Sequence, residues 1–144
     1  MPDVMVRNAT LDDAAALAML AGELGYPSTE TEMRARLARV SASAGDAVLV
    51  ATVESETAGW MHLAEVLSIE TGSYVEIRGL VVHAPLRSHG IGARLVAAAE
   101  EWARARGLAR MRVRSNVVRE RTHTFYERLG YAVTKTQKTF DKSL

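Results

Sequence analysis

A short glycine-containing segment carries the clearest chemical signal in the sequence. It lies between an apolar run at 80–82 and a long alanine-rich helical pattern, and it reads Arg87-Ser88-His89-Gly90-Ile91-Gly92-Ala93. Glycine has no Cβ atom, so consecutive backbone N–H groups of such a segment can turn toward one anion. A helix that begins there adds partial positive charge at its N-terminus. The segment therefore predicts a loop that binds a phosphate ester.

Two other kinds of phosphate loop are excluded by neighbouring residues. A dinucleotide-binding fingerprint needs a third glycine at position 95, where this chain has Leu95. A nucleoside triphosphate loop needs Gly-Lys-Ser or Gly-Lys-Thr, whereas Gly92 is followed by Ala93 and Arg94. The ligand of the predicted loop is thus a phosphate ester of another class.

The elements that must position this loop follow from hydrophobic periodicity. Two helix-capping signals, Thr10 with Asp13 and Thr29 with Glu32, open the first two predicted helices. Alternating or continuous apolar runs predict strands at 4–8, 47–53, 58–66 and 74–82, with Gly79 as the site of a β-bulge.

The second half of the chain alternates helices with strands. A helix is expected from the glycine segment to Gly107, a strand at 111–115, a helix at 119–129 and closing strands at 131–133 and 138–140. Alternation implies parallel crossovers, while the hairpins of the first half imply antiparallel pairing, so the sheet should be mixed.

Length and composition indicate one ordinary globular domain. The chain has 144 residues, of which 48% are hydrophobic and 24% charged, and we expect a single domain over 1–144. No run approaches the roughly 18 apolar residues of a membrane span, and the first residues do not read as a secretory signal. We therefore expect a cytoplasmic protein without a membrane partner. The absence of cysteine excludes disulfides and thiolate chemistry, and the scattered histidines predict no metal site.

Charge is distributed unevenly along the chain. Residues 1–72 hold 4 arginines and 11 acidic residues, whereas residues 73–144 hold 14 basic and 6 acidic residues. The predicted phosphate loop thus lies in a basic half that suits a polyanionic cofactor. The alternative interpretation is ordinary solvated surface charge that folding intermixes.

A second motif follows the glycine segment and changes the interpretation. Asn116 precedes the run Phe125-Tyr126-Glu127-Arg128-Leu129-Gly130-Tyr131. Together with Arg87-x-x-Gly90-x-Gly92-Ala93, this run resembles the Gcn5-related N-acetyltransferase (GNAT) superfamily over nearly the whole chain. The resemblance implies an α/β (α+β) fold with a mixed, mostly antiparallel twisted sheet of six to seven strands flanked by four helices.

The resemblance also implies acetyl-CoA as the cofactor. In that family the arginine–glycine loop holds the coenzyme A pyrophosphate, and the asparagine and tyrosine of the second motif lie along the pantetheine arm and near the sulfur. The implied cofactor-binding residues of this chain are Leu80, Val81, Val82, Arg87, Ser88, His89, Gly90, Ile91, Gly92, Ala93, Asn116 and Tyr126.

The chemistry implied is acetyl transfer to a primary amine by direct attack in a ternary complex. Tyr126 is the candidate general acid, since a phenol is protonated at neutral pH; its alternative is an aromatic core residue beside Phe125. Glu76 is the candidate general base, either directly or through water; its alternative is an ion pair with Arg78 on the same strand.

The acceptor is the least determined part of the reaction. A small-molecule amine is favoured over a protein or peptide amine, and a non-catalytic CoA-binding module is the alternative to an enzyme. Nucleic-acid binding is disfavoured because no aromatic residues are interleaved with the arginines at 104–114. The resemblance allows a homodimer, but no residue specifies one.

Overall fold

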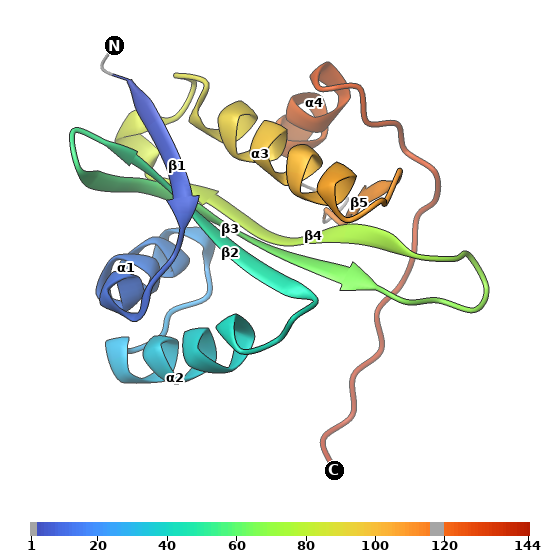
Figure 1. Cartoon of the computed structure of the whole chain (residues 1–144), viewed down its shortest axis with the longest axis horizontal. Coiled ribbons are helices and arrows are strands. Elements are labelled where there is room, and N and C mark those ends of the chain that lie inside the picture. Colours follow the sequence, from blue (N-terminus) through green and yellow to red (C-terminus); the bar gives the residue numbers. More distant parts are fainter. Residues whose placement is uncertain (1–2, 116–119) are drawn as a thin grey trace. The chain divides into compact units, whose positions relative to one another are not determined.

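A mixed β-sheet organises the first part of the chain (Figure 1). The structure is a computed structural model that describes residues 3–115 and 120–144. The described strands lie in chain order and are β1 (Val4–Asn8), β2 (Asp46–Val53), β3 (Glu56–Val66), β4 (Tyr74–Val82) and β5 (Met111–Val113). The pairs β1–β2, β2–β3 and β3–β4 are antiparallel, and β4–β5 is parallel. The prediction of a mixed, mostly antiparallel sheet is confirmed.

The described residues form four α-helices, the predicted number. They are α1 (Ala14–Leu24), α2 (Glu30–Ser41), α3 (Ile91–Ala105) and α4 (Glu120–Arg128), and short 3-10 turns stand at Leu11–Asp13 and Ala84–Leu86. The chain divides into two compact units, 1–113 and 114–144, and α4 belongs to the second. In neither unit does a described helix have the length and apolar character needed to cross a lipid bilayer.

The sheet of the first unit is covered on both faces, with α1 and α2 on one side and α3 on the other (Figure 1). Leu17, Leu37 and Val50 form the core between the two N-terminal helices and the sheet, with Trp60 packed against them. We call this side the α1–α2 face. On the opposite side, Leu95 of α3 lies against Gly59 of β3.

Both predicted capping signals begin helices. Thr29 N donates to Glu32 Oε1 over 2.9 Å, and Glu32 N donates to Thr29 Oγ1 over 3.0 Å. Thr10 begins the 3-10 turn Leu11–Asp13, which leads directly into α1, and there Thr10 N donates to Asp13 Oδ2 over 2.7 Å. These bonds satisfy N–H groups that a helix start leaves without partners, which is why local sequence is enough to place both starts.

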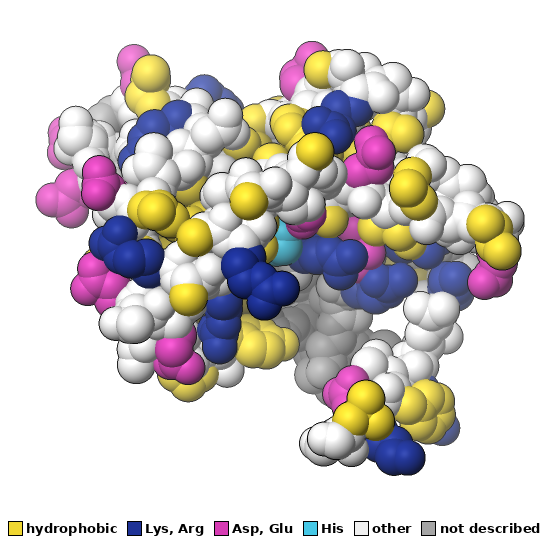
Figure 2. Space-filling view, turned by 60° about the horizontal axis from the view of Figure 1, so that its bottom comes forward, with side chains coloured by type: hydrophobic (Ala, Val, Ile, Leu, Met, Phe, Trp, Pro, Cys, Tyr) yellow, Lys and Arg dark blue, Asp and Glu magenta, His cyan; other side chains and the backbone are white. Residues whose placement is uncertain are grey.

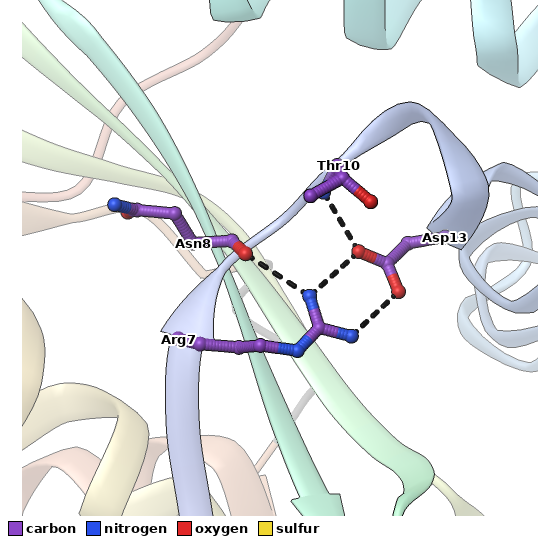
Figure 3. Close-up of polar contacts among 4 residues, drawn as sticks. All are labelled: Arg7, Asn8, Thr10 and Asp13. Carbon is purple, nitrogen blue, oxygen red and sulfur yellow. Dashed lines mark hydrogen bonds and ion pairs between the residues drawn. The ribbon is translucent and has the colours of Figure 1, made fainter.

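Asp13 also joins the first strand to the first helix (Figure 3). Arg7 donates from Nη1 and Nη2 to the two carboxylate oxygens of Asp13, each over 2.8 Å, and from Nη1 to the carbonyl of Asn8 over 3.0 Å. Asp13 is buried. The hydrogen bonds from Arg7 hold the pKa of Asp13 below its ordinary value of 3.8 against the opposing effect of burial. The carboxylate is therefore needed in its charged form.

Replacing Asp13 with Ala should lower the free energy of unfolding by about 2 kcal/mol. The substitution removes the carboxylate that accepts the capping bond from Thr10 N and the two hydrogen bonds from the Arg7 guanidinium. The pKa of Asp13 is lowered by folding, so its contribution is present above pH 3.8 and is lost as the pH falls below that value. Urea unfolding at pH 7 and pH 3 measures both effects. Asp12→Ala, at an exposed neighbour, is the control; equal losses in the two variants would contradict this role.

The closing strands predicted at 131–133 and 138–140 are wrong, and the sheet has five described strands rather than six to seven. Residues 131–144 contain no described strand, and Val133 and Phe140 are 76% and 88% exposed. Strand-forming residues make a strand only when a neighbour accepts their backbone hydrogen bonds and covers an apolar face. The fifth strand is also shorter than the predicted 111–115.

Candidate functional site

Strand β4 carries one extra residue at its centre. Leu63 of β3 pairs with Ile77, and His62 pairs with Gly79, so Arg78 has no counterpart of its own on β3. This is the β-bulge that Gly79 predicted, with Arg78 as the additional residue. A bulge changes which backbone groups face each neighbouring strand from that point onward.

The bulge turns two N–H groups of β4 toward the side of β5. Before it, Val75 N donates to Arg110 O over 3.0 Å, and after it, His83 N donates to Ala58 O over 2.8 Å. Since successive N–H groups of a strand point to opposite edges, those of Leu80 and Val82 face away from β3. Strand β5 pairs with β4 only as far as Ile77. No described strand therefore pairs with these two N–H groups.

The predicted phosphate loop lies between β4 and α3. Ser88 and Gly90 have left-handed backbones, with φ of 68° and 82°, and Gly90 is the N-cap residue of α3. No side chain of the described residues caps this helix; its first backbone bond is Arg94 N to Gly90 O over 3.0 Å. The N–H groups at 91–93 thus have no partner within the helix. The loop can bind an anion at a helix N-terminus whose N–H groups are left open.

Glu23 of α1 is hydrogen-bonded to the segment that precedes the loop. Glu23 accepts hydrogen bonds from Ala84 N over 2.8 Å and from His83 Nδ1 over 2.7 Å. The bond from Ala84, with smaller contributions from His83 and Arg87, keeps the pKa of Glu23 below its ordinary value against burial. Arg87 Nε donates to Val82 O over 3.1 Å, so the arginine is tied to the end of β4. Sequence reasoning missed Glu23, which is 60 residues from its partner and has no motif around it.

Glu76 is buried on β4, with 5% of its surface exposed. It pairs with Ala64 of β3 and, in parallel register, with Arg112 of β5. Paired residues share a face of the sheet, so Glu76 and Arg112 both lie on the α1–α2 face. Arg78 forms no ion pair with the described residues. Among the described residues, Glu76 and Arg78 therefore do not form the ion pair that was the alternative to a general base.

A histidine and an aspartate pair on the same face. His62 Nε2 lies 2.8 Å from Asp46 Oδ1, and Ser43 Oγ donates to Asp46 Oδ2 over 2.6 Å. Burial raises the pKa of Asp46, but the bonds from Ser43 and His62 and the charge of Arg78 together bring it below its ordinary value. The sequence offered no partner for His62, because Asp46 lies on the neighbouring strand, 16 residues away in the chain.

The second unit contains the tyrosine of the second motif. Tyr126 is 7% exposed and packs edge-to-face with Phe125 and Tyr131, at ring-centroid distances of 5.0 and 5.6 Å. Burial raises the pKa of Tyr126 to about 12. The phenol therefore keeps its proton throughout the physiological range. Asn116 lies outside the described residues.

The sequence profile of the Acetyltransferase (GNAT) family matches residues 13–131. The chain belongs to this family. The match extends over the phosphate loop, Glu76 and Tyr126, and it confirms both the predicted family and the predicted acyltransferase class.

Two curated relatives are N-acetyltransferases by name. The GNAT chain is 31% identical to an aminoalkylphosphonate N-acetyltransferase of Salmonella typhimurium over 137 residues, which cover 91% of this chain and 86% of that protein. It is 37% identical to the uncharacterized N-acetyltransferase YhdJ of Bacillus subtilis over 68 residues, which span 46% of this chain and only 48% of that protein.

A solved structure supports the fold. The aminoglycoside N-acetyltransferase AAC(6')-Iy, determined in complex with CoA, superposes with a TM-score of 0.88 over 100% of this chain and 97% of its own, at 16% sequence identity. The GNAT fold is thus shown.

The predicted site residues of this GNAT chain fall into two groups. The first unit brings together Glu76, the backbone of 80–82 and the loop at 87–93 along one continuous strand, turn and helix. Tyr126 lies in α4 of the second unit.

Proposed function

We propose that the protein is an acetyl-CoA-dependent N-acetyltransferase that transfers acetyl to a primary amine of a small molecule by direct attack in a ternary complex. The observation that carries this proposal is the uncapped start of α3, which follows a loop with two left-handed residues. We also propose that 1–144 is one domain, since the family match crosses the boundary between the two units.

The residues present fit the coenzyme. The N–H groups at the start of α3 and the guanidinium of Arg87 suit a pyrophosphate, and the outward N–H groups of Leu80 and Val82 suit the amides and carbonyl of an extended thioester arm. When bound, acetyl-CoA supplies its acetyl group as a thioester, which is activated toward attack by an amine. Asn116 is proposed to hydrogen-bond the same arm.

Two side chains are proposed to move protons. The Glu76 carboxylate accepts the proton that the amine loses on attack, directly or through a water molecule. The Tyr126 hydroxyl donates a proton to the departing sulfur. The first step leaves the product amide neutral, and the second leaves a thiol.

The size of the acceptor is inferred from relatives. The Salmonella relative is named for an aminoalkylphosphonate and the CoA-bound structural neighbour for aminoglycosides, and both are small molecules. A small acceptor is therefore favoured over a protein amine for this chain.

The test is acetyl-CoA turnover over a panel of amines, followed by thiol release. The chain has no cysteine, so the thiol reagent has no protein background. Saturable release with a small amine, and mass-spectrometric detection of its acetamide, is the expected result. Acetyl-CoA binding without release for any small amine, or release only with peptides, would overturn the proposal.

Tyr126→Phe should reduce kcat at least about tenfold while leaving the acetyl-CoA dissociation constant within about threefold, because only a proton donor is removed. The ring packing with Phe125 and Tyr131 is kept, so the melting temperature should hardly change. Calorimetric binding and steady-state kinetics on the same preparation separate these effects. An unchanged kcat would identify Tyr126 as a core aromatic residue alone.

A further inference from the structure

We propose that the acceptor amine carries an oxyanion, such as a phosphonate, phosphate or carboxylate, and that Arg110 and Arg112 bind it beside Glu76. The proposal rests on the proposed function and names its substrate class. It is carried by an arrangement of arginines around one tyrosine on the α1–α2 face.

Tyr74 holds two guanidinium groups against a single ring. The Cζ atom of Arg110 lies 4.8 Å from the ring centroid and that of Arg112 lies 4.5 Å from it. Tyr74 is itself buried, so the ring is a fixed platform. Stacking on an aromatic face restrains the planar guanidinium and leaves its edge available for a planar or tetrahedral anion.

Most donors of these two arginines are not used within the described chain. Arg112 Nη1 donates to the Tyr74 hydroxyl over 3.3 Å, and Arg110 Nη2 donates to Thr71 O over 3.3 Å. Each guanidinium has five N–H donors. Neither forms an ion pair with a described carboxylate. Two like charges held on one ring repel each other, and a bound oxyanion relieves that repulsion.

The register places this pair next to the proposed base. Glu76 and Arg112 are direct partners across β4 and β5, and Tyr74 lies two residues before Glu76 on the same face. Neighbouring strands are about 4.8 Å apart. A short aliphatic amine with an oxyanion at its other end can therefore direct its nitrogen to Glu76 and its anion to Arg112.

The surrounding charges favour an anion over a second cation. Arg78, the bulge residue, is a third positive charge close enough to this face to lower the pKa of Asp46, and Asp46 is already engaged by His62 and Ser43. On the side shown in Figure 2, basic side chains lie on either side of a histidine, with acidic side chains among them. An acceptor with additional amino groups would meet this repulsion, so the same residues discriminate against polyamines.

The experiment compares kcat/KM for matched amines on the full chain. Two of the amines carry an anionic second group, 2-aminoethylphosphonate and β-alanine, which we call the anionic amines; butylamine has no second charged group and serves as the neutral one, and 1,4-diaminobutane has a cationic second group. At least one anionic amine should exceed butylamine by about thirtyfold or more, the range expected for charge-assisted hydrogen bonds. This ratio does not depend on the fraction of active enzyme.

Arg112→Leu and Arg110→Leu should each reduce the anionic-to-neutral ratio at least about tenfold, with little change in the KM for acetyl-CoA. Arg104→Leu is the control, since it removes an exposed arginine that pairs with Glu101 on α3. The ratio remains interpretable even where a variant is less stable, because both substrates are measured on one preparation.

Three outcomes would overturn the inference. Butylamine or the diamine could be the preferred substrate, both arginine variants could keep the wild-type ratio, or the variants could raise the KM for acetyl-CoA but not for dephospho-acetyl-CoA. The last result would assign the arginines to the coenzyme phosphate. In the first two cases acetyl transfer continues and the proposed function stands, whereas no turnover with any amine would contradict the function itself.

Discussion

Replacing Glu76 with Gln should lower kcat at least about a hundredfold, since a positioned general base contributes factors of this order. The amide cannot accept the proton of the attacking amine. The loop proposed to bind the coenzyme and the outward N–H groups of β4 are unchanged by the substitution, so the KM for acetyl-CoA should stay within about threefold. Steady-state kinetics with a saturating amine measures both quantities.

The control for this substitution is Glu56→Gln, which removes an exposed carboxylate at the start of the neighbouring strand. It should leave kcat unchanged. Because Glu76 is buried, thermal unfolding of both variants must accompany the kinetics. A Glu76→Gln enzyme that is folded and fully active would show that solvent alone removes the proton.

Gly59→Ala should destabilise the protein by roughly 3 kcal/mol, because the added methyl group has no room. Its Cβ would lie 2.7 Å from the carbonyl oxygen of Val81 and 3.5 Å from Leu95 Cδ1. The oxygen belongs to the backbone of β4, so relief requires the strand to move. Since Leu80 and Val82 flank that carbonyl, acetyl-CoA affinity should fall together with stability.

Gly22→Ala provides the opposite control. Gly22 lies inside α1, and a Cβ atom added there would have no neighbouring atom within 4 Å outside its own helix backbone. Alanine is the better helix former by about 0.5–1 kcal/mol, so this variant should be more stable than the wild type. Denaturant unfolding of the two variants tests the pair, and a Gly59→Ala protein as stable as the wild type would contradict the packing argument.

Features of this fold that depend on residues close together in the sequence could be predicted from the sequence. The capping pairs at Thr10 and Thr29, the hairpins and the uncapped glycine loop are all encoded within a few residues, and the structure contains them. The two family motifs also lie within short stretches of sequence, so they indicated the positions of the glycine loop at 87–93 and of Tyr126. Gly79 marked the bulge, although the extra residue is its neighbour Arg78.

Features that depend on distant partners were not predictable. The tail at 131–140 has strand-forming residues, but sequence could not show whether a neighbour pairs with them. Glu23 meets His83 across 60 residues, and Tyr74 meets Arg112 across 38, with no periodicity to indicate either contact. The sequence suggested only a disfavoured nucleic-acid-binding role for the arginines at 110 and 112, and only the strand register places Arg112 beside Glu76.

The extra residue in β4 decides which residue numbers carry the N–H groups that face away from β3. Donors that face β5 have odd residue numbers before Arg78 and even numbers after it. Deleting Arg78 would restore regular antiparallel alternation from Ile77 to Gly79, so the N–H groups of Leu80 and Val82 would still face away from β3. Among descendants of this chain, a one-residue gap at the bulge would therefore leave these outward N–H groups in place and would remove only the local bend and twist that the bulge adds to β4.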